Sequence, residues 1–599
     1  MPSAPMLRFS LLAILIGLVA GAGAVVFRAL IALFHNVAFL GTLDTVYDTS
    51  VHTVAGPWGV WIILVPVAGA LIVAFLVKHF APEAKGHGVP EVIDAIYYER
   101  GVIRPVVALI KAVASALSIG TGAAIGREGP IIQIGAAFGS SVGQLLRVPH
   151  WQLVTLIAAG AGGGIAATFN TPIGGLLFAV ELILPEISSR TLIPVALATG
   201  AATYVGRMAF GDYPAFTIPN LTMQATQHVT LTAVGAYVAF GLILGLVSMV
   251  YTRSIYAFED FFDRLPGNYY TRHALGMLVV GIMMYLFLAH SGHYYIQGVG
   301  YATIQDILSE TLLNPALLLL LFAAKLLATS LTLGSGGSGG IFSPSLFIGA
   351  TLGGAYAALV GHFLPGVELS APTAAVIGMA GVVAGATGAV VTAIVMIFEM
   401  TRDYHIIIPL MISASVAYGV RRGLMRDNIY TLKLSRRGHI IPEALQTNLY
   451  LMHSVRDILD IPLLRRPLGD TAPLRRVIKN SRQPPHIIAV QDGRVASVVT
   501  AAKLRQIDPG LPLNEVFERH GTNDFILVRA AESLLDAFMR MRDAKQNVAV
   551  VTESGALESA DKVLGVVTWD KIARTSNLPM RLRQRKNSDA ASTTTKTPN

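Results

Sequence analysis

Apolar segments that are interrupted by glycine and proline constrain the fold of this chain more than any other feature. A membrane-spanning helix needs about 20 mainly apolar residues, and the clearest candidates are 9–33, 58–77, 229–251, 273–288, 315–333 and 406–420. Between them lie apolar stretches that glycine and proline cut up, at 105–119, 130–146, 153–169, 172–184, 192–205, 343–363 and 374–398. Because unpaired backbone groups are costly in lipid, broken helices survive there only where protein or a wet cavity surrounds them. We therefore expect an all-α polytopic membrane domain of broken and tilted helices.

The distribution of charge marks where the membrane part ends. Residues 1–420 hold 16 basic and 18 acidic side chains, whereas residues 421–599 hold the other 29 basic and 18 acidic ones. The first part therefore carries a formal charge of −2 and the second one of +11, within a net charge of +9. This partition excludes one large soluble domain, a disordered chain and a nucleic-acid-binding core. The arginines and lysines that directly follow residue 420 predict that the soluble part is cytoplasmic.

The soluble part contains a repeated pattern of β-branched strands and amphipathic helices, at about 449–504 and about 524–574. Two copies of one α/β unit predict a paired module over residues 435–580 that follows a membrane domain over 1–434. The expected helices are 455–461, 474–480, one that begins at 501, 533–542 and 570–574, and the expected strands are 486–490, 495–500, 525–528, 547–552 and 563–568. Residues 581–599 are polar, basic and rich in serine and threonine, and are predicted to be disordered.

Three glycine-containing segments precede apolar helices in the membrane part. Residues 86–91 read GHGVPE, residues 126–130 read GREGP, and residues 334–344 read GSGGSGGIFSP. Proline suits the first turn of a helix, and the free amides at that end favour a nearby negative group. Helices that begin inside the bilayer can therefore hold an anion near its midplane.

Glu128 is the ionisable residue of greatest interest in these segments. It lies beside Arg127 between two glycines, and ionisable groups within membrane segments are costly and tend to be functional. Two alternatives are that Glu128 only caps its helix and that Arg127 neutralises it. Residues 86–91 could likewise form an ordinary turn.

The segment 334–344 allows further interpretations. It lacks the Gly-Lys-Ser/Thr ending of a nucleotide phosphate loop, which excludes that function. Residues 336–339 match the short G-x-S-G signature of intramembrane serine proteases, in which Ser338 would be the nucleophile and His290 the candidate base. A protease is a remote alternative, and we expect no enzyme. Because the chain has no cysteine, a thiolate metal site is excluded, and no metal site is expected.

Together, the three segments resemble the CLC family of chloride channels and proton-coupled chloride transporters. The resemblance extends from residue 9 to about residue 434 and includes NIY at 428–430, QIG at 133–135, FNTP at 169–172, GVGY at 298–301 and EMT at 399–401. It implies two inverted repeats, over about 9–206 and 229–420. It also implies a homodimer in the lipid bilayer, with one pore in each protomer and a chloride ion among the helix ends.

The resemblance also implies roles for individual residues. Glu128 matches the gating glutamate, whose carboxylate competes with chloride and would be released by protonation. The anion path would be lined by Arg127, by the hydroxyl of Tyr430, and by backbone amides near Gly88, Val89, Gly129, Ile341 and Phe342.

Two departures from the family pattern bear on function. His87 stands where the family usually has serine; its imidazole would donate to an anion, more strongly when protonated, unless the side chain turns away. The preference for chloride over other small anions is therefore left open. Leu182, which follows Glu181, occupies the position of the internal proton-transfer glutamate. Because leucine cannot relay a proton, a gated passive channel is favoured, and a proton-coupled antiporter is the alternative.

The paired soluble module resembles tandem CBS domains, many of which bind adenine nucleotides through an acidic residue after a Thr-x-x motif. Here residues 500–502 are followed by Lys503 and residues 568–570 by Lys571, although Asp570 lies one position early. We therefore expect a dimerisation and gating scaffold and a doubtful nucleotide site. No cofactor is required, and the chloride ion is the expected substrate.

Overall fold

The computed structural model describes residues 4–185, 187–218, 231–364, 366–367, 369–439, 441, 454–459, 462–478, 484–556 and 559–575. The chain separates into two compact units, Met1–Ile441 and Pro442–Asn599. The predicted tail at 581–599 and the beginnings of the predicted second repeat and first CBS unit lie outside the described residues.

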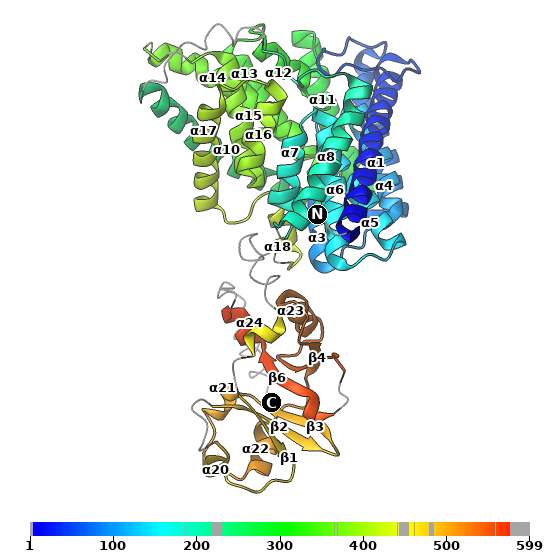
Figure 1. The fold of residues 1–599 in the computed structure, drawn as a ribbon. Coiled ribbons are helices and arrows are strands. Elements are labelled where there is room, and N and C mark those ends of the chain that lie inside the picture. Colours follow the sequence, from blue (N-terminus) through cyan, green and yellow to red (C-terminus); the bar gives the residue numbers. More distant parts are fainter. Residues whose placement is uncertain are drawn as a thin grey trace, which may run out of the picture. The chain divides into compact units, whose positions relative to one another are not determined.

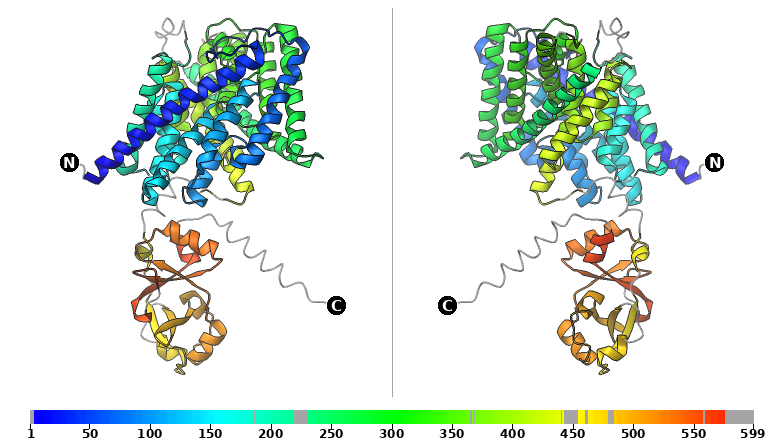
Figure 2. Two further views of the ribbon diagram at one scale, coloured as in Figure 1. Left: turned by 90° about the vertical axis from the view of Figure 1, so that its right-hand side faces the viewer. Right: turned by 90° about the vertical axis from the view of Figure 1, so that its left-hand side faces the viewer.

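The first unit is built from helices (Figures 1 and 2). Eight helices among the described residues are long and apolar enough to cross a membrane, which confirms the predicted polytopic domain. In chain order the elements are α1 (Ala4–His35), η1 (Asn36–Leu40), η2 (Gly59–Leu64), α2 (Val65–Phe80), η3 (Pro82–Ala84), α3 (Val89–Tyr98), α4 (Pro105–Gly120), α5 (Glu128–Leu145), α6 (His150–Phe169), α7 (Pro172–Phe178), η4 (Ala179–Ile183), α8 (Ser189–Phe210), α10 (Leu231–Arg264), α11 (Tyr269–Ser291), α12 (Tyr301–Leu308), α13 (Pro315–Gly334), α14 (Phe342–Phe363), α15 (Ala371–Thr387), α16 (Val390–Thr401), α17 (Ile407–Leu424) and α18 (Thr431–Arg436).

The apolar stretch expected at 374–398 is not one segment but parts of two helices. Helix α15 ends at Thr387 and α16 begins at Val390. Gly388 between them has a φ of +81°, which glycine adopts without the strain that a Cβ imposes. The break was hidden in the sequence because residues on both sides of it are uniformly apolar.

The two halves of the membrane unit repeat one order of elements, because α3–α8 correspond to α12–α17. Helices α7 and α16 lie side by side (Figure 1) and run antiparallel. The Glu181 carboxylate accepts hydrogen bonds from the first amides of α16, at Val391 and Thr392. In return, the Glu399 carboxylate accepts from the first amides of α7, at Ile173 and Gly174. This reciprocal capping is the arrangement that inverted repeats produce.

Glycines bring the same helix pair together in each half. A Cβ at Gly135 on α5 would overlap the carbonyl oxygen of Gly160 on α6. At the corresponding place in the second half, a Cβ at Gly378 on α15 would overlap the carbonyl oxygen of Gly349 on α14. Small residues are enriched where helices pack closely in membranes, because they let the backbones approach.

The second unit consists of two three-stranded sheets with the same topology. In each, the first strand is parallel and the third antiparallel to the central one, with a register irregularity in the central strand. The elements are η5 (Val455–Ile458), β1 (Leu463–Pro467), α20 (Leu474–Ile478), β2 (His486–Gln491), β3 (Arg494–Val499), α21 (Ala501–Leu504), α22 (Leu513–His520), β4 (Ile526–Arg529), α23 (Leu534–Asp543), β5 (Val548–Thr552), η6 (Ala560–Lys562), β6 (Val563–Thr568) and α24 (Trp569–Thr575).

The repetition of one α/β unit is thus present, although its predicted elements were incomplete. Strand β1 and helix α22 were not predicted, and the helix expected at 455–461 is a short 3-10 turn. Strand β1 reads LLRRP, so arginines and a proline replace the usual apolar alternation, and the strand lies at the edge of its sheet, where proline is tolerated.

The glycine contact between α14 and α15 predicts a stability effect. We expect Gly378→Ala to lower the thermal unfolding midpoint of the purified protein, because overpacking a tight contact costs about 1–3 kcal/mol. The matched control is Gly419→Ala on α17, where a Cβ meets nothing within 4 Å, so the midpoint should stay level or rise slightly. Equal midpoints for the two variants in a detergent unfolding assay would contradict this packing.

Candidate anion site

The three glycine-containing segments meet in the membrane unit. The amides of Gly126 and Gly340 each donate to the carbonyl of the other, at 2.7 and 2.6 Å. The amide of Gly86 donates to the Gly337 carbonyl at 3.0 Å, and its carbonyl accepts from the Gly339 amide at 3.2 Å. Helices α3, α5 and α14 start directly after these contacts, so their N-terminal ends are held close to one another.

Two fully buried lysines donate hydrogen bonds to the backbone of the segments that precede α3 and α12. The Lys111 ammonium donates to the carbonyls of Ala84 and Gly86, and the Lys325 ammonium donates to those of Ile296 and Gly298. The lysines lie on the corresponding helices α4 and α13 of the two halves. Each lysine therefore satisfies carbonyl oxygens of the segment that precedes a helix, α3 or α12, and adds positive charge near the start of that helix.

The Glu128 carboxylate occupies the N-terminal end of α14. Its Oε1 accepts hydrogen bonds of 2.6 Å from the hydroxyls of both Tyr301 and Ser343, and its Oε2 accepts one of 3.2 Å from the Ser343 amide. The side chain is 1% exposed. A buried carboxylate that is surrounded by hydroxyl and amide donors at a helix start stands where a free anion would bind.

Arg127 contributes charge to this site without forming a close ion pair. Its Nε lies 3.9 Å from Glu128 Oε1 and has no hydrogen-bond partner among the described residues. The guanidinium lies over the Tyr301 ring, 5.3 Å from its centroid. The alternative of a simple neutralising pair is therefore weakened, because hydroxyl and amide donors make the short contacts to the carboxylate.

His87 is buried, and its side chain points into the protein beside Tyr256 and Tyr430. Its Nε2 lies 3.3 Å from the Tyr256 hydroxyl, and the two rings of His87 and Tyr430 are 5.8 Å apart between centroids. Tyr430, at the start of α18, is also buried. The imidazole is thus enclosed at the start of α3 and is not turned towards solvent.

The structure places the predicted backbone positions as follows. Gly88 precedes α3, and the Val89 amide donates to the His87 carbonyl at 3.0 Å. Gly129 lies in the first turn of α5, and Ile341 and Phe342 begin α14. The amide that meets the carboxylate is one residue further along, at Ser343.

Sequence reasoning missed Tyr301 and Ser343 as partners of Glu128. The segment 298–301 has the same glycine spacing as 86–89, and both precede short helices of corresponding place, α12 and α3. Aligning the two halves of the chain on these glycines would have marked Tyr301 as a residue at a helix start.

The remaining predicted residues lie apart from Glu128. Leu182 is in the π-helical turn η4, and the adjacent Glu181 caps α16. The pair that a protease would need is absent: the Ser338 hydroxyl bonds to Ser115 and the Ala84 carbonyl, whereas the exposed His290 bonds to the Leu286 carbonyl.

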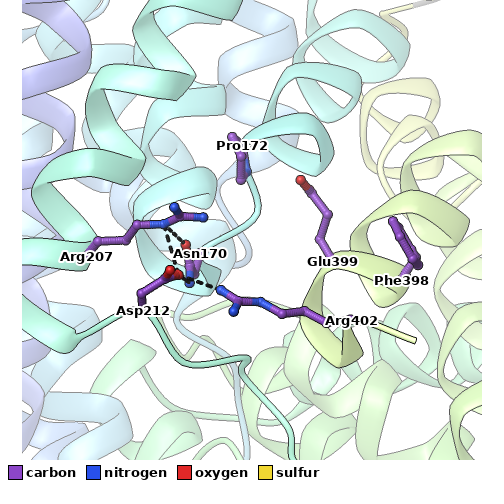
Figure 3. A pocket seen from close by; sticks show the side chains of 7 residues that line it. All are labelled: Asn170, Pro172, Arg207, Asp212, Phe398, Glu399 and Arg402. Carbon is purple, nitrogen blue, oxygen red and sulfur yellow. Dashed lines mark hydrogen bonds and ion pairs between the residues drawn. The ribbon is translucent and has the colours of Figure 1, made fainter. Parts of the chain in front are cut away.

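A surface pocket of about 290 Å³ lies at the ends of α6, α7, α8 and α16 (Figure 3). Arg207 and Arg402 both pair with Asp212 there, at 3.2 and 2.5 Å. The pocket is lined by Asn170, Pro172, Arg207, Asp212, Phe398, Glu399 and Arg402, and contains no predicted anion residue. Asp212 bridges both arginines and thereby joins the ends of these helices.

A smaller cavity of about 140 Å³ borders His87. Beside it, Lys433 and Arg437 pair with Glu91, each at 2.8 Å. The cavity is lined by Pro82, Lys85, Gly86, His87, Ile255, Tyr256, Glu259, Leu333, Lys433 and Arg437.

Comparison with known proteins identifies similar chains. The family described as voltage gated chloride channel matches residues 69–422. A putative chloride channel protein ClcB-like of Ralstonia nicotianae is 33% identical over 63% of this chain and 86% of its own length. The H(+)/Cl(−) exchange transporter ClcA of Vibrio parahaemolyticus is 31% identical over 67% of this chain and 88% of its own.

Solved structures share the fold. A slow cyanobacterial Cl⁻/H⁺ antiporter is 25% identical, with a TM-score of 0.62 over 72% of this chain and 98% of its own. A eukaryotic CLC transporter is 20% identical, with a TM-score of 0.59 over 94% of this chain and 98% of its own.

The position of Glu128 predicts competition with free anions. Replacing Glu128 by alanine should tighten chloride binding by roughly tenfold or more, since about 1.4 kcal/mol of relieved repulsion is a factor of ten. Titration calorimetry with potassium chloride measures this affinity. The matched control is Glu399→Ala, which removes a carboxylate that caps α7 and should leave the affinity unchanged. An unchanged affinity in Glu128→Ala would show that the carboxylate does not occupy an anion site.

Proposed function

The chain belongs to the family of voltage gated chloride channels, and we propose that it exchanges chloride for protons across a membrane. The observation that carries this proposal is the Glu128 carboxylate in the place of an anion at the start of α14. Exchange is further supported by the ClcA relatives, which are named H(+)/Cl(−) exchange transporters, and by the similar antiporter structure.

Chloride transport is coupled to protons because chloride and the Glu128 carboxylate compete for the same place at the start of α14. Two unit negative charges 4 Å apart repel each other by about 4 kcal/mol at an effective dielectric constant of 20. Chloride can therefore reach the Ser343 amide only after the Glu128 carboxylate leaves or is neutralised. Protonation of Glu128 neutralises the carboxylate and also frees it to leave, because the neutral acid has no charge that holds it at the helix start. Each opening of the path then requires one proton at this carboxyl group.

The donors along the path suit a small anion that must bind and leave again. Hydroxyls, backbone amides and helix starts supply partial positive charge, which attracts chloride without the strong binding that a close full charge would cause. The amide of Ser343 and the hydroxyl of Tyr301 contact the carboxylate now and would contact chloride after it moves. Tyr430 and His87 would serve the part of the path beside α3.

A passive chloride channel is the second candidate function, and Leu182 is the observation that favours it. A leucine in η4 offers no proton acceptor, so a proton route through that position is closed. In a passive channel, protonation of Glu128 would still open the path, but no proton would cross the membrane in exchange for chloride.

We also propose a homodimer whose soluble unit is a cytoplasmic, CBS-like regulatory module. A nucleotide in that module stays doubtful, because the ammonium of Lys503 donates to the His520 carbonyl at 3.1 Å in the region where a ribose partner was expected. Lys503 is also a cation, whereas the ribose position calls for an acid. The substrate of the membrane unit is the chloride ion, and other small anions are tested by the same flux assay.

Exchange and passive conduction differ in one measurement. In liposomes with purified protein and a chloride gradient, we expect chloride flux to drive protons uphill, as recorded by a pH electrode. Glu128→Gln should keep chloride flux and lose both proton movement and pH dependence, because the amide mimics the neutral acid. Chloride flux without proton movement in the unaltered protein would reject exchange in favour of the channel.

The two hydroxyls that bind Glu128 should set the pH at which the path opens. They stabilise the charged carboxylate, so removing one makes protonation easier and moves the midpoint of pH-dependent flux to higher pH. A hydrogen bond to a charged group contributes about 1.5–3 kcal/mol, which corresponds to a shift of roughly one pH unit or more. We expect this shift in flux assays of Tyr301→Phe and Ser343→Ala.

Matched controls lie on α14 itself. The Ser345 hydroxyl donates to the Ile341 carbonyl, and the Tyr356 hydroxyl donates to the Ala236 carbonyl. Ser345→Ala and Tyr356→Phe therefore lose a hydrogen bond that does not involve Glu128, and their pH midpoint should match that of the unaltered protein. A shift of equal size in the controls would assign the effect to general destabilisation.

A further inference from the structure

An exchanger must deliver protons to the buried Glu128 from the side of the membrane on which α3 and α18 meet. Glu181 on this side already caps the start of α16, because its carboxylate accepts hydrogen bonds from the Val391 and Thr392 amides and from the Thr392 hydroxyl. Leu182 carries no titratable group. The Glu91 carboxylate is already paired with Lys433 and Arg437, each at 2.8 Å. None of these three residues therefore offers a free proton acceptor.

His87 has a nitrogen that is available for this purpose. The Tyr256 hydroxyl donates its single proton to the Ile429 carbonyl at 2.6 Å, so it can only accept at its contact with His87 Nε2. The Nε2 atom must then carry the imidazole hydrogen, which leaves a lone pair on Nδ1. The Nδ1 atom is buried and has no hydrogen-bond partner among the described residues, and the whole residue is 3% exposed.

His87 also lies between a cavity and the gate. The adjoining cavity of about 140 Å³ is large enough for a few water molecules, each of which takes about 30 Å³ in the liquid. On the other side, the His87 carbonyl packs against Gly129, directly after Glu128. The Tyr430 ring lies beside the imidazole, with 5.8 Å between the ring centroids.

The charges around His87 couple a proton to an anion. Lys111 on α4 and Lys433 and Arg437 on α18 are cations, and Glu91 on α3 is an anion. The other titratable groups that face this region are Lys85, Tyr256, Glu259 and Tyr430. Because His87 is buried and positive charge predominates around it, an imidazolium ion is disfavoured, and an anion beside the ring would lessen that cost. A chloride ion at the start of α3 supplies that negative charge, so each ion favours binding of the other.

From this geometry we propose that His87 is the proton acceptor of the exchange on this side of the membrane, an inference that rests on the proposed function. A proton from water in the cavity binds the Nδ1 lone pair while chloride binds beside it. The proton then passes through water next to Tyr430 to the Glu128 carboxylate, and the imidazole returns to its neutral form. Only N–H and O–H bonds are made or broken, and each proton that one group releases is taken up by the next.

The first test measures proton transport. In the liposome assay, His87→Gln should lower the number of protons moved for each chloride ion by roughly a hundredfold, the usual contribution of a positioned proton-transfer group. His273→Gln is the matched control, because that buried histidine uses its Nδ1 in a hydrogen bond with Ser335, and it should keep full coupling. Unchanged coupling in His87→Gln would overturn this inference and leave exchange intact, whereas absent coupling in the unaltered protein would overturn the proposed function itself.

The second test measures proton uptake on chloride binding and removes the contribution of the gate. Potassium chloride is titrated calorimetrically into Glu128→Gln in two buffers of different ionisation enthalpy, at about pH 5.5–7.5, where histidine titrates. We expect binding to take up protons in this variant and not in the double variant Glu128→Gln/His87→Gln. Binding heats that do not depend on the buffer in Glu128→Gln would overturn the proposal, whether or not the double variant folds.

Discussion

Every backbone amide that is left free at a helix start inside a membrane needs a partner, and this requirement underlies the whole membrane unit. Where α7 and α16 begin, the carboxylates of Glu399 and Glu181 satisfy the amides permanently. Where α14 begins, the partner is the Glu128 carboxylate. The same physical need thus places a carboxylate at all three helix starts, and in the exchange that we propose only Glu128 would give way to a free anion or take up a proton.

The repeated order of elements explains why so many helices stop within the bilayer. Corresponding helices place corresponding features together: Gly126 pairs with Gly340, and the buried Lys111 and Lys325 support corresponding loops. The repeats differ at these helix starts. Segment 126–130 supplies the Glu128 carboxylate, whereas the corresponding part of 334–344 supplies the amide and hydroxyl of Ser343 that bind it.

Local patterns in the sequence predicted the polytopic domain and the repeated soluble unit, because proline, glycine and charge act over a few positions. The gating role that the sequence predicts for Glu128 stays a prediction. Contacts between distant segments were not accessible in this way. Tyr301 and Ser343 meet Glu128 only after α12 and α14 are folded onto α5. The break at Gly388 was missed because it lies in a uniformly apolar stretch, and β1 was missed because an edge strand tolerates arginines and proline.

The positions of full positive charges suit the proposed path, which must attract an anion and still release it. Lys111 and Lys325 direct their ammonium groups at backbone carbonyl oxygens of the segments that precede α3 and α12. Arg127 lies 3.9 Å from the carboxylate and leaves the short contacts to hydroxyls and an amide. A lysine in contact with chloride would hold it too strongly, whereas in the exchange that we propose distributed partial charges would let a single proton on Glu128 change which negative group is bound.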